Sequence, residues 1–266
     1  MCEECDDGNT DSGDGCSSTC GLENGFERTV LGVGLEAAAC PAAGSLSVCT
    51  PIARVLYKFE NTISIIDSIG NAPSLATSGT PTAVADRCGN VAGALAFTGG
   101  SYAEAAEKSV HTDILDGNFM ISVWVRMTTY VTGQWGAIMS TRSGTNGWAL
   151  HVGGSTEAVP GRVMFLAGSG TCKTTTATLP LNTWTHVVVT WDGTNTNIFL
   201  NGVLPTLEDL GPAPTNPGSA LRVAGDASDA LTFEGEIDDV LISPANPSAA
   251  GAMTLYQATQ LTCDQS

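Results

Sequence analysis

Apolar and polar residues alternate along several short stretches of the chain. The stretch FMISVWVRM, residues 119–127, is the clearest case: every second residue from Phe119 to Val125 is apolar, and Ser122 and Arg126 fall on the other face. A period of two is the pattern of a strand with one face in a core. We therefore expect residues 119–127 to form a strand of a sheet.

Turn signals separate further strands. Residues 184–205, WTHVVVTWDGTNTNIFLNGVLP, contain three apolar runs separated by Asp-Gly and Asn-Gly pairs, which favour tight hairpins. The segment is therefore predicted to be a β-meander. Similar runs occur at 54–60, 94–97, 101–106, 135–141, 147–153, 162–168, 220–225 and 233–243. About a dozen strands without a helical pattern between them indicate an all-β fold, a two-sheet antiparallel sandwich.

Composition agrees with many short strands and limits the partners. The 266 residues are 42% hydrophobic and only 14% charged, with 31 glycines and 12 prolines. Ten basic against 27 acidic residues give a formal charge of −17, which repels nucleic acid and anionic lipid surfaces. No apolar run reaches the length of a membrane span. We expect no nucleic-acid partner and no membrane span.

The cysteines divide the chain near residue 50. Six of the nine cysteines lie in the first fifty residues, a segment too short to bury a core, where disulfides replace hydrophobic stabilisation. We predict a disulfide-stapled module at 1–50 and a larger domain, the two-sheet sandwich, at 51–266. The cysteines expected in disulfides are Cys2, Cys5, Cys16, Cys20, Cys40 and Cys49.

Two metal-binding alternatives remain open for the first module. Cys2, Cys5, Cys16 and Cys20 have roughly the spacing of a four-thiolate zinc site, although seven acidic and no basic residues lie among the first 25. Asp7, Asn9, Asp11 and Asp14 alternate with glycines and suit calcium in a tight loop. A solvated acidic turn held by disulfides is the third alternative.

The first module resembles a known repeat. The stretch EECDDGNTDSGDGCSSTCGLENGF is similar to the cysteine-rich repeat named after myxobacteria. The resemblance implies oxidised cysteines and an extracellular or cell-surface location. No secretory signal segment is visible at the start of this sequence, so we expect any such segment to lie outside it.

The larger segment resembles a second family over about residues 52–260. The stretches LPLNTWTHVVVTWDGTNTNIFLNGVLP and FEGEIDDVLISPANPSAAGAMTLYQ are similar to the concanavalin A-like, laminin G-type jelly roll. The resemblance implies a two-sheet antiparallel sandwich whose closing strand is followed by a short helix. It also implies calcium near the junction of the first and last strands, bound by carboxylates.

The positions that match this calcium site are Glu60, Asp67, Asn71, Asp238 and Asp239. Because side chains alternate along a strand, Asp238 and Asp239 are expected on opposite faces. Hydrogen-bonded structural carboxylates are the alternative interpretation.

The same sandwich occurs in laminarinase-type glycoside hydrolases, whose catalytic strand carries two glutamates around an aspartate. The segment EIDDVLI, residues 236–242, offers Glu236 and Asp238, but Val240 stands where the second glutamate would be. A retaining mechanism needs two carboxyl groups. The sequence is therefore interpreted as that of a non-enzyme, with hydrolysis as the remote alternative.

Carbohydrate recognition would use exposed aromatic side chains beside polar loops. The candidate ligand-binding residues are Tyr102, Tyr130, Trp135 and Trp148, each of which is also a candidate for the core. We predict a calcium-stabilised adhesion module that binds a glycan or an extracellular protein. The alternative is a structural surface component that associates with itself, which the odd number of cysteines favours.

Overall fold

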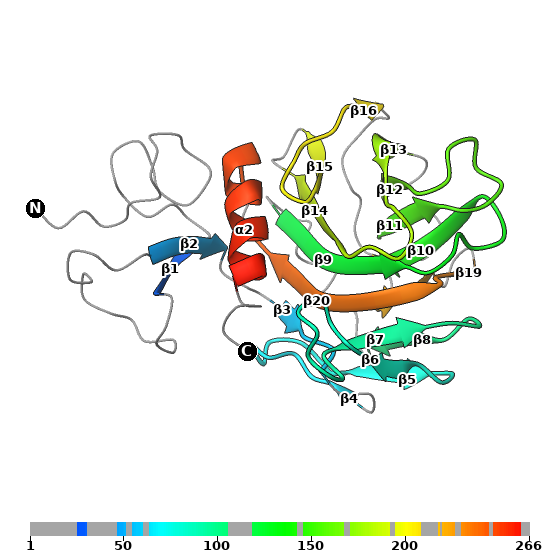
Figure 1. The fold of residues 1–266 in the computed structure, drawn as a ribbon, viewed down its shortest axis with the longest axis horizontal. Helices are drawn as coiled ribbons and strands as arrows, with labels where there is room; N and C mark the ends of the chain where they lie inside the picture. Colours follow the sequence, from blue (N-terminus) through cyan, green and yellow to red (C-terminus); the bar gives the residue numbers. More distant parts are fainter. Residues whose placement is uncertain are drawn as a thin grey trace, which may run out of the picture.

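The computed structural model describes residues 26–30, 47–51, 55–60, 64–105, 119–142, 146–167, 171–191, 195–208, 218, 220–226, 230–244 and 247–261. Within these residues the fold is made almost entirely of antiparallel strands (Figure 1). The prediction of a two-sheet antiparallel sandwich is confirmed.

The larger sheet has nine strands, in the spatial order β16, β13, β12, β11, β10, β17, β8, β5, β4. In chain order, their bounds are β4 Ser64–Ile65, β5 Leu75–Ser78, β8 Tyr102–Ala105, β10 Trp135–Ser140, β11 Trp148–Gly153, β12 Arg162–Ala167, β13 Thr171–Thr178, β16 Leu207–Glu208 and β17 Arg222–Val223.

The second sheet has seven strands, in the order β15, β14, β9, β20, β7, β6, with β3 also paired to β20. Their bounds are β3 Val55–Tyr57, β6 Thr82–Val84, β7 Ala94–Phe97, β9 Phe119–Met127, β14 Thr185–Trp191, β15 Thr196–Leu200 and β20 Gly235–Ser243. The predicted Asn-Gly turn follows β15: Asn201 and Gly202 have φ of 51° and 75°, and Leu200 and Val203 exchange two backbone hydrogen bonds around them.

Two small antiparallel sheets complete the strands. β1, Phe26–Val30, pairs with β2, Ser47–Pro51, and β18, Gly225–Asp226, pairs with β19, Leu231–Thr232. The hairpin of β1 and β2 lies beside helix α2, Ala249–Leu261, away from the sandwich (Figure 1). The short helix implied after the closing strand is therefore present.

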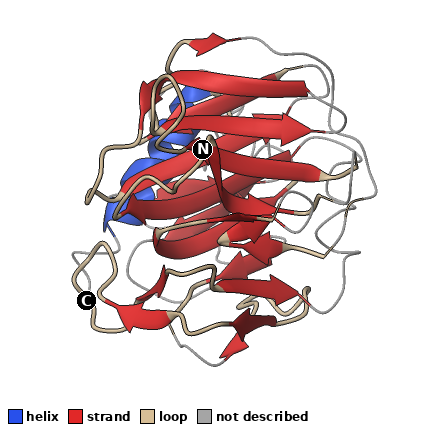
Figure 2. Cartoon of the chain, turned by 90° about the vertical axis from the view of Figure 1, so that its right-hand side faces the viewer, coloured by secondary structure: helices blue, strands red, loops and turns tan. Residues whose placement is uncertain are grey.

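The main core lies between the two large sheets. Ile121, Val123 and Val125 of β9 all belong to it, as the alternation of residues 119–127 predicted. The outward face of the seven-stranded sheet packs on the helix instead: Met120 and Val188 form a second apolar cluster with Leu255 of α2. Figure 2 shows the helix at one side of the stacked strands. Helix α2 therefore covers one outer face of the sandwich.

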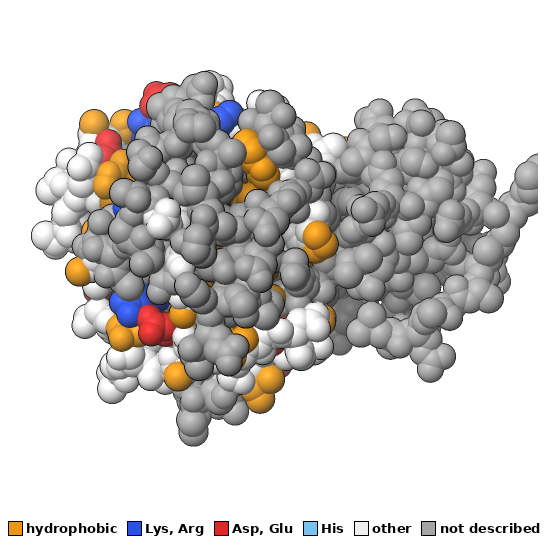
Figure 3. Space-filling view, turned by 180° about the vertical axis from the view of Figure 1, so that it is seen from behind, with side chains coloured by type: hydrophobic (Ala, Val, Ile, Leu, Met, Phe, Trp, Pro, Cys, Tyr) orange, Lys and Arg blue, Asp and Glu red, His pale blue; other side chains and the backbone are white. Residues whose placement is uncertain are grey.

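Exposed hydrophobic side chains are scattered over the described surface. The large ones are Ile66, Ile69, Val91, Val159, Val203 and Leu204, and on the face drawn in Figure 3 the coloured hydrophobic side chains do not gather in one patch. None of the helices in the described ranges is both long and apolar enough to span a membrane.

Candidate functional site

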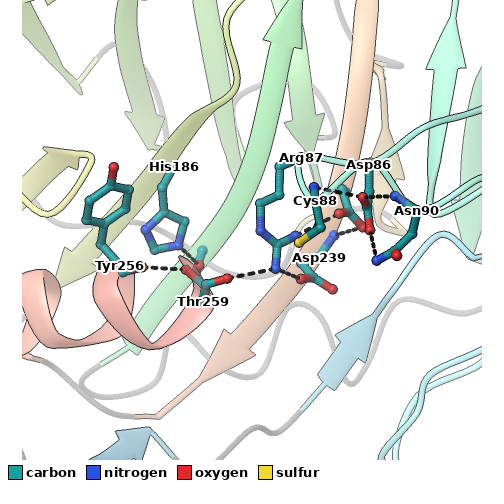
Figure 4. A network of polar contacts seen from close by, with 10 residues as sticks. Asp86, Arg87, Cys88, Asn90, His186, Asp239, Tyr256 and Thr259 are labelled. Carbon is teal, nitrogen blue, oxygen red and sulfur yellow. Dashed lines mark hydrogen bonds and ion pairs between the residues drawn. The ribbon is translucent and has the colours of Figure 1, made fainter. Parts of the chain in front are cut away.

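Arg87 lies in the loop between β6 and β7, at the centre of a buried ion-pair cluster (Figure 4). The Asp86 carboxylate orders this loop, since it accepts hydrogen bonds from the backbone N–H groups of Cys88 at 2.8 Å and Asn90 at 2.9 Å. Arg87 Nη1 lies 2.8 Å from Asp238, and Nη2 lies 2.9 Å from Asp239. The Arg87 side chain is only 7% exposed, so one guanidinium bridges two carboxylates inside the fold.

A β-bulge in β20 brings both carboxylates to Arg87. The register of β20 against β9 shifts between Asp238 and Leu241, and Asp239 has a φ of 45°. The prediction that Asp238 and Asp239 point to opposite faces is therefore wrong. An extra residue in one strand breaks the alternation of side chains, and aspartate tolerates the left-handed backbone better than most residues.

Three rings extend the cluster along the outward face of the seven-stranded sheet. Trp124 of β9 stacks on His186 of β14 with 4.9 Å between ring centroids, and Tyr256 of α2 lies 6.1 Å from His186. The guanidinium carbon of Arg87 lies 4.9 Å from the centroid of the Trp124 ring, within cation–π range. Arg87 Nη2 also donates to the backbone carbonyl of Thr259 at 3.3 Å. The loop of Arg87 is thereby joined to α2.

Burial controls protonation in this cluster. Burial and the nearby Arg87 lower the pKa of His186 to about 3, so that the imidazole is neutral. Its Nε2 shares a 2.7 Å hydrogen bond with Ser122 Oγ. Burial, followed by the charge of Asp239, raises the pKa of Asp238 to about 8, although Arg87 opposes the shift. Burial also raises the pKa of Asp239. The two carboxylates therefore compete for one cation.

Asp67 is a structural carboxylate. One of its oxygens accepts from the backbone N–H groups of Leu56 at 2.8 Å and Ile69 at 3.1 Å, and the other accepts from those of Asn71 at 2.7 Å and Ala72 at 2.8 Å. These bonds close the turn between β4 and β5 and tie it to β3. The two oxygens already accept hydrogen bonds from four N–H groups. Asp67 is therefore a hydrogen-bonded structural carboxylate, which is the alternative interpretation of the sequence at this position.

The five positions of the implied calcium site do not form one ligand set. Asp67 binds backbone N–H groups, while Asp238 and Asp239 bind the guanidinium of Arg87. Glu60 is close enough to Asp239 to act on its charge, but Lys58 is as well. Calcium requires a shell of oxygen ligands, and a guanidinium among the carboxylates does not fit it. The described residues contain no group of three or more His, Cys, Asp or Glu side chains that could hold a metal ion.

The predictions for the first module stay predictions. Asp7, Asn9, Asp11 and Asp14 lie outside the described residues, as do Cys2, Cys5, Cys16, Cys20 and Cys40. Cys49 lies in β2, whose side chains are not among those described. Cys88, next to Arg87, is disulfide-bonded.

A second polar cluster lies on the outward face of the nine-stranded sheet. Asp226 of β18 is fully buried, and its Oδ2 atom accepts a hydrogen bond from Ser140 Oγ at 3.0 Å. His151 Nε2 lies 3.2 Å from the same oxygen, and Arg142 Nη1 lies 3.7 Å from it. Asp226 thus holds Arg142, whose side chain is 13% exposed, at the margin of a buried network.

Trp135 shares the outward face of β10 and β11 with this cluster. The register pairs Trp135 with Gly153 and Ala137 with His151, whereas Val152, one residue along, belongs to the core. Alternation therefore places the half-buried Trp135 on the same face as His151. Its strand partner is a glycine, which leaves the indole without a side chain directly opposite.

Tyr102 and Arg222 form a stacked pair on the same sheet. The guanidinium carbon of Arg222 lies 4.0 Å from the centroid of the Tyr102 ring, and Arg222 Nε donates to Glu104 at 2.7 Å. The register joins this pair to the Asp226 cluster, because Arg222 of β17 is the strand partner of both Glu104 and Ser140. We call these residues the sheet-face site: the strand residues Tyr102, Glu104, Trp135, Ser140, His151 and Arg222, together with Arg142 after β10 and Asp226 of the adjoining β18.

The other two aromatic candidates lie elsewhere. Trp148 is fully buried in the main core and stacks on Phe165, so its prediction as a surface ligand platform is corrected: it is an inward residue of β11. Tyr130 is half-buried and packs against the main core. An added Cβ at Gly161 would lie 3.1 Å from the Tyr130 ring. The ring of Tyr130 is therefore held by the loop around Gly161.

The sequence carries no recognisable pattern for four polar members of the sheet-face site. Ser140, Arg142, His151 and Asp226 are spread over 87 positions of the chain and form no motif. Only the pairing of β10 with β11, and of β18 with β19 beside them, brings them together. The one available signal was the alternation of His151 with apolar residues in β11.

Two of the three residues compared above with the catalytic strand of laminarinase-type hydrolases, Glu236 and Asp238, form ion pairs. Glu236 lies 2.8 Å from Arg126 and is 8% exposed, Asp238 is bound by Arg87, and Val240 is in the core. Glu236 and Asp238 share the outward face of β20, because Ile237 between them points into the core.

Comparison with family models assigns the chain to a known superfamily. A family model described as the concanavalin A-like lectin/glucanases superfamily matches residues 97–250, more than half of the chain. The chain is a member of this superfamily. The matched range does not include the first fifty residues, so their resemblance to a cysteine-rich repeat stays a prediction. The chain matches no curated protein.

Solved structures of this superfamily fold resemble the chain at low sequence identity. Domain 4 of AbnA, a GH43 extracellular arabinanase from Geobacillus stearothermophilus in complex with arabinotriose, is 18% identical with a TM-score of 0.59, over 77% of this chain and 98% of that domain. A sialidase from Trypanosoma rangeli is 14% identical with a TM-score of 0.62, over 85% of this chain and 36% of that one. The receptor-binding domain of botulinum neurotoxin type G is 18% identical with a TM-score of 0.55, over 78% and 51%. The chain thus spans about a third of the sialidase and half of the toxin domain.

These comparisons correct one interpretation of the sequence. The chain was expected not to be an enzyme, but the similar structures include a domain of an arabinanase and a sialidase. The fold of the superfamily therefore occurs in enzymes as well as in binding domains. The valine at position 240, in place of a second glutamate, argues only against the laminarinase-type pair of catalytic glutamates.

Proposed function

We propose that the sandwich binds a carbohydrate through the sheet-face site. In this proposal Trp135 supplies an aromatic surface for a sugar ring, and the side chains of Arg142, Arg222 and Glu104 bond to its hydroxyl groups. These four side chains are at least partly exposed, whereas Asp226, Ser140 and His151 are buried and hold Arg142 in place. An aromatic surface beside a few fixed polar groups is the usual composition of a sugar site.

The observation that carries the proposal is the burial of Asp226 with three polar partners on a face that does not pack against the other sheet. Burying a carboxylate has a large desolvation cost, and its partners must offset that cost. A sheet face without a role in recognition would be stable with apolar or neutral side chains there. A network that fixes an arginine beside a tryptophan is useful for recognition, because it orders the binding groups before the ligand arrives.

The similarity to domain 4 of the arabinanase supports the same function. The matched region covers 98% of that domain, and that domain is in complex with arabinotriose. The receptor-binding domain of the neurotoxin has the same fold. Recognition of a glycan or of a glycosylated protein partner is consistent with both.

We further propose that the chain is exported, and that its first module is stapled by disulfides and binds calcium at Asp7, Asn9, Asp11 and Asp14. The acidic charge and the crowding of cysteines in the first fifty residues support this proposal. Mass mapping of the disulfides under non-reducing conditions, with and without calcium, tests it.

Glycan-array screening of the full chain tests the carbohydrate proposal. Arabinotriose and the other oligosaccharides that the array selects are then titrated by calorimetry. We expect Trp135→Ala and Arg142→Ala to weaken binding by about tenfold each, since ring stacking contributes up to about 1.5 kcal/mol beyond the buried area and a charged hydrogen bond about 1.5–3 kcal/mol. Arg126→Ala, which removes a similar ion-paired arginine from the seven-stranded sheet, is the matched control and should bind as the wild type does. A folded wild-type chain that binds no glycan would overturn the proposal.

A further inference from the structure

The arginines of the sheet-face site are already neutralised by carboxylates. Arg222 is paired with Glu104, and Arg142 with Asp226. Arg162, farther along the same sheet on β12, is paired with Glu208. Every arginine that the structure describes on this sheet therefore has an acidic partner. An anionic ligand would have to compete with these carboxylates, which are part of the protein and cannot leave.

The charge of the whole chain acts in the same direction. A formal charge of −17 repels an anion as it approaches. A site for acidic ligands is expected to gather uncompensated cations that overcome such a field. In the described part of this sheet the arginines are all paired, and Lys173 of β13 is the strand partner of the core residue Phe165, so alternation places it on the face opposite to the sheet-face site. Electrostatics therefore disfavours sugars with carboxylate or sulfate groups.

Neutral hydroxyl groups suit an ion pair well. A hydroxyl can accept from a guanidinium N–H and donate to the neighbouring carboxylate, so one sugar hydroxyl can use both members of a pair. Arg222 and Glu104 are adjacent strand partners with side chains 20% and 38% exposed. The pair thus offers donors and an acceptor side by side at the surface.

Trp135 and the carboxylate of Glu104 lie too far apart for one sugar ring. Glu104 is on β8 and Trp135 is on β10, with β17 between them. Two strand spacings separate the strands by about 10 Å, and the residues are also offset along the strands. A ligand that reaches both side chains is longer than a monosaccharide.

We infer that the ligand of the sheet-face site is an uncharged oligosaccharide of more than one unit, oriented by the Arg222–Glu104 and Arg142–Asp226 pairs. This inference rests on the proposed function and adds the charge and the minimum length of the ligand.

The test compares three probes on the full chain by calorimetric titration: a neutral trisaccharide such as arabinotriose or another that the array selects, the corresponding monosaccharide, and a trisaccharide that contains uronic acid. We expect the neutral trisaccharide to bind at least about tenfold more tightly than the other two. Its affinity should change less than about twofold between low and physiological salt, because no net charge is exchanged. Tighter binding of the acidic probe, or equal binding of the monosaccharide, overturns the inference while the proposed function stands. Absence of binding by every glycan overturns the proposed function itself.

Glu104→Gln gives a sharper test of the charge argument. The substitution keeps the size of the side chain but leaves Arg222 with an uncompensated charge. We expect the ratio of acidic to neutral affinity to rise at least about fivefold. The matched control is Glu236→Gln, which frees Arg126 on the other sheet and should leave the ratio unchanged. The same rise in both variants would mean that only the net charge of the chain matters, which contradicts the inference.

Discussion

Arg87 lies over the ring of Trp124, with its guanidinium carbon 4.9 Å from the ring centroid, while it bonds to two adjacent carboxylates of β20. At the two aspartates for which the family resemblance implies a calcium ion, the positive charge is therefore that of the Arg87 guanidinium. The loop between β6 and β7, the closing strand and helix α2 all meet at this guanidinium.

Loss of Arg87 should destabilise the fold strongly. Arg87→Ala leaves two buried carboxylates without their cation, and we expect it to lower the free energy of unfolding by about 3–5 kcal/mol. Arg87→Lys should lose less, because it keeps the charge but cannot bridge both carboxylates with a planar fork. Urea denaturation measures both. Arg126→Ala leaves one carboxylate unpaired instead of two, and the arginine it removes is 34% exposed, so it should cost less than Arg87→Ala. Equal losses for Arg87→Ala and Arg126→Ala would contradict this prediction.

Calcium should not bind at the Arg87 cluster. Calorimetric titration of calcium into the wild type and into Asp239→Asn should therefore give the same number of sites, whether or not the first module binds the ion. A site that is present in the wild type and lost in Asp239→Asn would show that the metal displaces Arg87.

Stability should fall as the pH rises from about 4 to about 8 because of Asp238. Its folded pKa is raised to about 8 by burial and by Asp239, so the folded state binds more protons than the unfolded state between about pH 4 and pH 8. The free energy of unfolding contributed by this group declines as the pH rises through that window, by at most about 1.4 kcal/mol per pH unit. Asp238→Asn removes the titrating group. Its unfolding free energy, compared with that of the wild type from pH 5 to pH 9, should show a flatter profile.

His186 should have the opposite effect at acidic pH. Its folded pKa is lowered to about 3 by burial, so the unfolded state binds the extra proton between about pH 6.5 and pH 3. The stabilisation is complete above pH 6.5 and is lost as the pH falls. His186→Gln retains a polar partner for Ser122 but does not titrate. Thermal unfolding at pH 7 and pH 4.5 should show a smaller acid-induced drop for this variant, and an unchanged drop would assign the effect to other groups.

Asp67 should contribute strongly to stability, and this contribution should not depend on a bound metal ion. Asp67→Ala leaves four backbone N–H groups without their acceptor, and we expect a loss of at least about 2 kcal/mol. Addition of a chelator should change the unfolding midpoint of the wild type and of Asp67→Asn by the same amount. A chelator effect confined to the wild type would identify Asp67 as a calcium ligand instead.

Much of the fold follows from local sequence patterns. The period-two alternation of residues 119–127 and the Asn-Gly turn at Asn201 depend on neighbouring residues only, and both are present in the structure. The direction of Trp124 and His186 away from the core also follows from alternation, since Trp124 lies between two core valines of β9 and His186 precedes the first core valine of β14.

The candidate sites depend on contacts that alternation cannot supply. The bulge at Asp239 reverses the expected direction of one side chain, and it is visible only in the register of β20 against β9. Arg87 and Asp238 are 151 positions apart, and Ser140 and Asp226 are 86 apart. For Trp148 the sequence leaves both the surface and the core open, because a tryptophan beside a polar loop suits either location, and the pairing of β11 within the nine-stranded sheet decides between them.

The left-handed backbone of Asp239 has a consequence for sequence drift. At a φ of 45°, asparagine and glycine are as acceptable as aspartate, whereas branched residues are strained. Substitution of Asp239 by asparagine would remove one of the two carboxylates that pair with Arg87 and would leave the backbone path unchanged. The shape of the closing strand and the charge it carries can therefore evolve independently.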